Sequence, residues 1–201
     1  MRKLVLFLLF TTFHFFGQDI SEINKNINLS ETLEFEREIR IYKDYSITTS
    51  IEIFRMYDEG QNNWTVVIYY YNKEFKTATK INEIQFPKEN IGKLKVKDAN
   101  LIWLNFILND IEYLPSIKDI DYKLKTTSIE IEDGEKIILK RKISPLDGES
   151  YEVFVKNGKV ENNFIFNGLN SYLKHYPQVD ELISYNKLLS IINTEFNLWN
   201  D

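Results

Sequence analysis

The chain has 201 residues, a length that suits one domain with a substantial buried core. Apolar residues make up 43% of the sequence and glycine and proline are few, which excludes a disordered or collagen-like chain. The sequence contains no cysteine, which excludes disulfide frameworks, thiolate metal sites and cysteine nucleophiles.

The N-terminus has the pattern of a secretory signal peptide. Arg2 and Lys3 precede an almost wholly apolar run over residues 4–16, and Gly17 is a small residue just before the sequence turns polar. The run has 13 residues, fewer than the ~20 that a membrane-spanning helix needs. We therefore expect residues 1–17 to be removed, and the mature protein to be periplasmic or secreted without a transmembrane anchor.

The predicted mature chain is acidic. Loss of the two cations Arg2 and Lys3 changes the formal net charge from −5 to −7. Nucleic-acid binding requires a concentrated basic surface, so we expect no nucleic-acid partner. His14 lies in the removed segment, which leaves His175 as the one histidine. One imidazole without a thiol cannot form a multi-histidine zinc site, and we expect no metal site and no cofactor.

The first half of the mature chain has the two-residue alternation of β-strands. Residues 19–32 are polar with isolated apolar positions, which predicts a loosely ordered lead-in. Alternation over residues 33–41 and 47–53 suits half-buried strands, with a helix as the alternative over the first range. Residues 64–71 are apolar on both faces and predict a central strand, and residues 77–86 predict a fourth.

A helix is predicted over residues 98–114. Asp98 is a suitable N-cap, and Pro115 closes the segment. Six of the seven residues from 102 to 108 are apolar, so we expect the helix to be buried on most sides across the concave face of the sheet.

Two hairpins are predicted within residues 122–166. Asp133-Gly134 and Asn157-Gly158 each separate two alternating segments, and glycine accepts the positive φ of a tight turn. We expect an antiparallel meander whose register follows from these turns. The residues expected to face inward are Ile129, Ile131, Ile137, Leu139, Val153 and Val155, and those expected in solvent are Glu130, Glu132, Lys140 and Lys142.

Residues 168–199 change to helical periodicity. A short helix over 170–176 ends at Pro177, and a longer one over 179–199 carries a core-facing apolar stripe. The sequence thus predicts a single α+β domain over residues 18–201. Its antiparallel, curved sheet has about seven or eight strands in two meanders over residues 33–86 and 122–166, covered by a buried central helix and C-terminal helices.

No catalytic residue can be assigned. The chain has no glycine-rich phosphate loop and no nucleophile elbow around a serine. Its acidic residues Asp133, Glu135, Asp147 and Glu149 fall in predicted turns, where such residues are expected for backbone reasons.

Aromatic residues are the remaining candidate site. Tyr69, Tyr70 and Tyr71 occupy consecutive strand positions and must point to both faces of the sheet, while Trp64 and Trp103 are candidates to lie close together. We interpret these residues as core packing. The alternative is an apolar pocket between the curved sheet and the predicted 98–114 helix.

The C-terminal part carries short motifs within residues 147–196. They are Asp147-Gly148-Glu149-Ser150-Tyr151, then Asn170-Ser171-Tyr172-Leu173 with Tyr176-Pro177, then Glu181-Leu182. This set resembles the tail of a family of uncharacterised exported proteins of Bacteroidetes-type bacteria. The resemblance covers about a quarter of the chain, implies export and implies no activity.

Three functions are compatible with the sequence. The one we predict is a non-catalytic binding or interaction module of the cell envelope, which recognises another envelope protein through a sheet edge or an aromatic patch. A periplasmic carrier of a lipid or small apolar ligand would need a sizeable apolar cavity. A carboxylate-based glycan hydrolase would need two acidic side chains that converge in a cleft.

Overall fold

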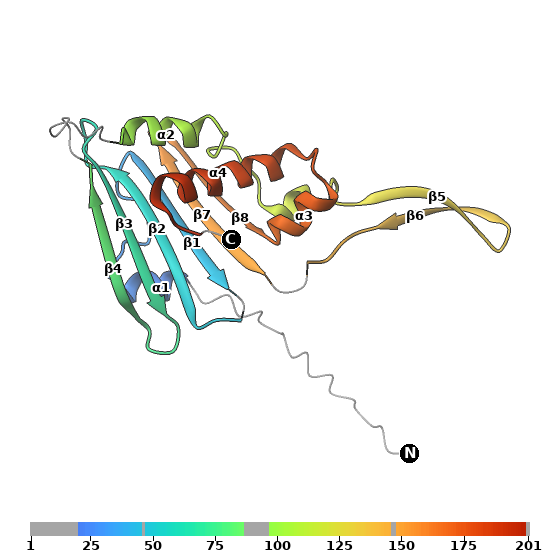
Figure 1. The fold of residues 1–201 in the computed structure, drawn as a ribbon, viewed down its shortest axis with the longest axis horizontal. Coiled ribbons are helices and arrows are strands. Elements are labelled where there is room, and N and C mark those ends of the chain that lie inside the picture. The colour runs from blue at the N-terminus through green and yellow to red at the C-terminus, as the bar shows by residue number, and fades with distance from the viewer. Residues whose placement is uncertain (1–19, 46, 87–96, 146–147, 200–201) are drawn as a thin grey trace, which may run out of the picture.

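The computed structural model describes residues 20–45, 47–86, 97–145 and 148–199, and the predicted signal segment lies outside these ranges (Figure 1). Eight strands and four α-helices are described, and the fold is α+β with an antiparallel sheet, as predicted. The sheet does not close, so β4 and β8 form its edges.

Six strands form the main sheet in the order β4-β3-β2-β1-β7-β8. The first strand of the chain is therefore central, because β7 pairs with its free side and joins the β7–β8 hairpin to the β1–β4 meander. The prediction of a second meander over residues 122–166 is wrong, because among the described strands of that range only β7 and β8 belong to this sheet. The bounds are β1 Arg37–Tyr45, β2 Ser50–Asp58, β3 Trp64–Asn72, β4 Thr77–Gln85, β7 Glu149–Asn157 and β8 Val160–Asn167.

Helices cover both faces of this sheet. One face lies under α2 (Ala99–Ile107), α3 (Leu169–His175) and α4 (Asp180–Phe196), with the short 3-10 helix η1 (Ile117–Ile120) beside β8 (Figure 1). The opposite face lies under α1 (Ile20–Asn26), whose Ile23 packs against Tyr42 and Ile53. The prediction of a loosely ordered lead-in over residues 19–32 is wrong for α1, because its few apolar side chains are enough to fill that face.

Strands β5 (Thr126–Glu132) and β6 (Glu135–Arg141) do not join the main sheet but form a two-stranded hairpin that projects from the body (Figure 1). The prediction that Ile129 and Ile131 face inward is wrong, since each is 73% exposed. Val153 and Val155 are buried, as predicted.

The tight turn of the β5–β6 hairpin explains how its side chains divide. Asp133 and Gly134 both have positive φ, at 50° and 83°. This two-residue turn fixes the register of the strands, in which Ile129 lies opposite Ile138. Ile129 and Ile131 therefore share one face of the hairpin, whereas Ile137 and Leu139 point to the other.

Helix α2 begins after its predicted cap, since Asp98 accepts a hydrogen bond from the backbone N–H of Leu101 at 3.1 Å. It ends at Ile107, earlier than predicted, and a left-handed Asp110 turns the chain. Its inner side is buried, including Trp103 and Phe106. The prediction that this helix is buried on most sides is wrong for its outer side. Leu101, Leu104 and the C-cap residue Leu108 are 54%, 48% and 78% exposed.

A buried ionic network holds the segment before β1 against the sheet. The Glu38 side chain is fully buried, and its Oε1 accepts hydrogen bonds from Arg40 Nη2 and Arg55 Nε, both at 2.8 Å. Its Oε2 accepts from the backbone N–H groups of Glu34 and Phe35 at 2.7 and 3.1 Å. Burial raises the pKa of Glu38, but the hydrogen bonds and charges of Arg55 and Arg40 outweigh it and hold the pKa below its ordinary value.

Replacing this carboxylate tests the network. Glu38→Gln is expected to lose about 3–5 kcal/mol of unfolding free energy at pH 7, because it leaves the buried Arg40 guanidinium without its anion and Arg55 with Glu34 alone. A lowered pKa stabilises the folded state at pH values above the unfolded-state pKa. The gap between wild type and variant should therefore shrink as the pH falls below the ordinary value of 4.5.

Urea denaturation at several pH values measures this gap. Glu161→Gln is the matched control, since that carboxylate is 61% exposed and pairs with Lys156 at the surface. It is expected to change stability by less than about 1 kcal/mol. Equal losses in the two variants, or a gap that does not change at low pH, would contradict the network.

A second prediction concerns Gly168, which has φ +55°. A Cβ there would lie 2.6 Å from Cβ of Pro145, whereas Gly158, at φ +61°, has nothing within 4 Å. Both alanine variants are expected to lose about 1–2 kcal/mol of unfolding free energy, because a residue with a Cβ is strained in the left-handed backbone conformation. Gly168→Ala adds about 1–3 kcal/mol of overpacking, so urea denaturation should show the larger loss for Gly168→Ala. Equal losses would show that the Pro145 contact is readily relieved.

Candidate functional site

The two tryptophans of the predicted aromatic site lie together in the core. Trp64 on β3 and Trp103 on α2 have ring centroids 5.3 Å apart, and each side chain is buried. They fill the space between the sheet and α2 where the alternative predicted an apolar pocket. This part of the candidate site is core packing.

The three tyrosines divide between the two faces of the sheet. Tyr70 is partly buried on the face of Trp64, whereas Tyr69 and Tyr71 belong to the apolar cluster under α1. Tyr71 accepts a hydrogen bond from Asn26 Nδ2 at 3.0 Å. Alternate strand residues point to opposite faces, so the five predicted residues do not line one surface.

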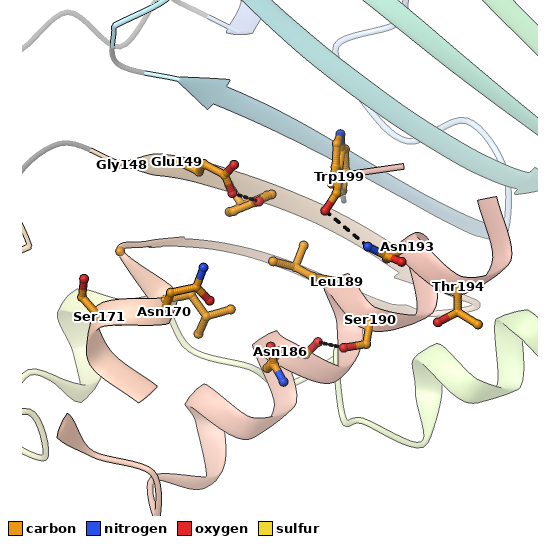
Figure 2. Close-up of a pocket in the computed structure, with 13 residues that line it drawn as sticks. Gly148, Glu149, Asn170, Ser171, Asn186, Leu189, Ser190, Asn193, Thr194 and Trp199 are labelled. Carbon is orange, nitrogen blue, oxygen red and sulfur yellow. Dashed lines mark hydrogen bonds between the residues drawn. The ribbon is translucent and has the colours of Figure 1, made fainter. Parts of the chain in front are cut away.

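A cleft of about 580 Å³ lies between the start of β7 and the helices α3 and α4 (Figure 2). We call it the Trp199 cleft. Its volume is within the ~300–1,000 Å³ range of small-molecule sites. The lining residues are Gly148, Glu149, Tyr151, Gly168, Leu169, Asn170, Ser171, Asn186, Leu189, Ser190, Asn193, Thr194 and Trp199.

A charge pair lies at the wall formed by β7. The ammonium group of Lys43 is 2.9 Å from Glu149 Oε1, and the lysine side chain is 1% exposed. Glu149 Oε2 accepts a hydrogen bond from the Tyr151 hydroxyl. Burial raises the pKa of Glu149, but the hydrogen bonds from Tyr151 and Lys43 outweigh it and keep the pKa below its ordinary value. The carboxylate is thus ionised and already neutralised by its partner.

The aromatic wall comes from the chain just after α4. Asn197 and Trp199 have left-handed backbones, with φ of 54° and 59°, and this reverses the chain over the sheet. Trp199 Nε1 donates to Glu52 Oε2 at 3.0 Å, and the Trp199 carbonyl accepts from Asn193 Nδ2 at 3.5 Å. The indole also packs edge-on against Tyr151 at 5.7 Å. These contacts fix the position of the ring.

The remaining wall presents neutral hydrogen-bonding groups. Asn186, Ser190 and Thr194 recur at four-residue spacing along one side of α4, and all three are exposed. Asn170 and Ser171 line the cleft from α3 (Figure 2). Amide and hydroxyl groups both donate and accept hydrogen bonds, so this wall can bind a ligand that does the same.

The signal for this cleft in the sequence is the polar stripe on α4 beside its apolar stripe. The sequence predicts a core-facing apolar stripe on the 179–199 helix, and it offers no sign that the polar side chains beside this stripe line a cleft. It also gives no means to join Glu149 to Trp199, which are fifty residues apart in the chain. Two of the resembling motifs, around Gly148 and around Asn170, supply lining residues.

The described residues that line the Trp199 cleft include one carboxylate, Glu149. The hydrolase hypothesis requires two acidic side chains in one cleft, and the described lining residues supply only one. Across the described ranges, no cluster of three or more histidine, aspartate or glutamate side chains is placed to hold a metal ion. None of the described helices has the length and apolar character to cross a membrane.

Comparisons with protein-family models, with curated proteins and with solved structures find no match to the chain.

A double-mutant cycle tests the charge pair at the cleft wall. Glu149→Gln should lose about 3–5 kcal/mol of unfolding free energy, because it leaves the buried Lys43 ammonium without its anion. Lys43→Met combined with Glu149→Gln should recover most of this loss, since both charges are then gone. Urea denaturation of the single and double variants measures the coupling. Additive losses would show that Lys43 and Glu149 do not depend on each other.

Proposed function

We propose that the protein is an exported, non-catalytic binding module, and that the Trp199 cleft takes a small, uncharged polar ligand of the saccharide class. The observation that carries the proposal is the chemistry of the cleft wall. One side is an indole ring, and the other is a row of amide and hydroxyl groups on α3 and α4.

The electrostatics of the cleft favour a neutral ligand. Glu149 is the one charged side chain among the lining residues described, and Lys43 already neutralises it. A charged ligand would have to compete with this pair or remain unpaired, and both cost free energy. A neutral ligand leaves the pair intact.

The arrangement of polar and aromatic groups favours a hydroxyl-rich ligand. Sugar hydroxyls donate and accept hydrogen bonds, as do the side-chain amides of Asn170 and Asn186. The Ser190 hydroxyl donates to the Asn186 carbonyl at 2.7 Å and can accept a hydrogen bond from a ligand. A sugar ring also has an apolar face, which suits the indole of Trp199. An apolar lipid would leave these amides and hydroxyls unsatisfied, so the carrier hypothesis is less well supported.

Export is part of the proposal. It is supported by the apolar run over residues 4–16 after Arg2 and Lys3, and by the resemblance of residues 147–196 to exported proteins. Neutral saccharides are common outside the inner membrane, which is consistent with a binding module at that location.

Calorimetric titration of the mature chain with a panel of neutral mono- and oligosaccharides tests the proposal. A glycan-array screen selects the probe, while a uronic acid and a fatty acid represent charged and apolar ligands. We expect at least one neutral saccharide to bind and the other two classes not to bind. Tight binding of the fatty acid alone would favour the carrier hypothesis instead, and no saccharide binding would overturn the proposal.

Matched variants of α4 locate the binding site. Ser190→Phe introduces a bulky ring into the cleft from an exposed position and should weaken binding at least tenfold, because it occupies the ligand volume. Lys187→Phe introduces the same ring at an exposed position of the same helix outside the cleft lining, and should leave the affinity unchanged. Equal effects of the two variants would place the saccharide elsewhere.

A further inference from the structure

The β5–β6 hairpin carries an apolar face that no other part of the described chain covers. Ile129, Ile131 and Ile138 lie on this face and are 73%, 73% and 68% exposed. The register places Lys136 opposite Ile131 and Lys140 opposite Thr127, so both lysines share the face. We call this surface the Ile129 face. It is apolar, its charged groups are all cationic, and the glutamates of the hairpin strands lie on the other side.

This hairpin gains little from packing within the chain. A two-stranded hairpin alone is marginally stable in water. Figure 1 shows β5 and β6 extending away from the six-stranded sheet and its helices. An exposed apolar strand pair of this kind indicates a surface that another molecule covers.

A second uncovered apolar surface lies on α2. Leu101, Leu104 and Leu108 are spaced along the outer side of this helix, and we call them the α2 stripe. The charged side chains between residues 98 and 117 are Asp98, Asp110 and Glu112, all acidic. Two described cations lie near the helix, and both are paired: Lys97 with Glu195, and Arg37, which also donates to Asn100 Oδ1, with Asp58. The α2 stripe is therefore apolar with acidic neighbours.

We propose that the Ile129 face of one copy of the chain docks on the α2 stripe of a second copy. The two surfaces are both aliphatic, and their charges are opposite, with Lys136 and Lys140 on one and Asp98 and Asp110 on the other. Their lengths are of the same order. The stripe rises about 10 Å from Leu101 to Leu108, and Ile129 to Ile131 spans about 7 Å of strand beside Ile138.

Pairing of like surfaces is less favourable. Two Ile129 faces in contact would bring lysines against lysines, and two α2 stripes would bring carboxylates against carboxylates. Docking within one copy is prevented by the fold, since the hairpin projects from one end of the long axis and α2 lies toward the other (Figure 1). The contact is therefore head-to-tail between copies, and such a contact adds further copies in a row unless it closes into a ring.

Sedimentation velocity of the wild-type chain at increasing concentration is the first measurement. Small protein–protein interfaces of a few side chains bind weakly, so we expect the copies to associate with a dissociation constant on the order of 100 μM. Ile129→Asp and Leu104→Asp should each raise this constant at least tenfold, because each places a charge in the apolar contact. Ile47→Asp is the matched control, an exposed isoleucine at 83% outside both surfaces, and should have no effect.

A mixture of the two variants gives the decisive result. The Leu104→Asp chain keeps an intact Ile129 face, and the Ile129→Asp chain keeps an intact α2 stripe, so one contact can still form between them. We expect each variant alone to stay monomeric and an equimolar mixture to form a dimer and nothing larger.

Other outcomes overturn the proposal. A wild-type chain that stays monomeric at millimolar concentration, or a variant mixture that stays monomeric, excludes this head-to-tail contact. Loss of association in Ile47→Asp as well would show that the effect is not specific to these surfaces. Binding to anionic phosphatidylglycerol vesicles that Ile129→Asp abolishes and Leu104→Asp leaves intact would assign the Ile129 face to a membrane surface instead. None of these outcomes depends on a ligand in the Trp199 cleft.

Discussion

The burial of charged side chains on β1 is the constraint on which much of the structure depends. This central strand is covered on both faces, and Glu38, Arg40 and Lys43 are at most 2% exposed. Buried ions must be paired to be tolerated. On one face, Arg40 Nη1 donates to the Ser30 carbonyl at 2.6 Å and Glu38 accepts from the chain just before β1, which holds that chain against the sheet. On the other face, Lys43 is paired with the first residue of β7. Charged side chains of β1 therefore take part both in the pairing of β1 with β7 and in the covering of the α1 face.

The same constraint determines the character of the Trp199 cleft. Because Glu149 compensates Lys43, the carboxylate stays ionised but adds no net charge to the wall. The indole of Trp199 closes over this pair, with the Lys43 ammonium 5.7 Å from its ring centroid. The polar side of α4 then supplies the opposite wall. A cleft built on a neutralised ion pair and rimmed by amides suits recognition of a neutral molecule better than acid–base chemistry, which needs a group free to exchange a proton.

Local patterns predicted much of the fold but little of the site. Alternation and turn residues predicted β3 and β4 to within a residue of their ends, and the Asp98 cap predicted the start of α2. The strand predicted over residues 33–41 begins instead at Arg37, because alternation cannot show that Glu34 and Phe35 donate their backbone N–H groups to Glu38. Periodicity also treats an apolar strand residue as buried, and Ile129 shows the limit of this rule, since burial depends on whether the strand docks. The Trp199 cleft joins elements distant in sequence, and its polar residues have the pattern of any solvated helix face.

The edges of the main sheet explain why the β5–β6 hairpin remains apart from it. The hairpin lies between α2 and β7 in the chain, so the edge strand β8 would be its natural neighbour. That edge is occupied, because the Ser116 hydroxyl accepts the Ile165 N–H at 3.0 Å, and Asn162 Nδ2 donates to the Ile111 and Leu114 carbonyls at 3.1 and 2.9 Å. The segment before η1 therefore takes one backbone N–H of this edge, that of Ile165, and packs beside the edge through the side chain of Asn162. With part of this edge occupied and the central strand β1 covered on both faces, the isoleucines of the hairpin remain outside the core of their own chain. Their apolar surface can be removed from water only by another molecule.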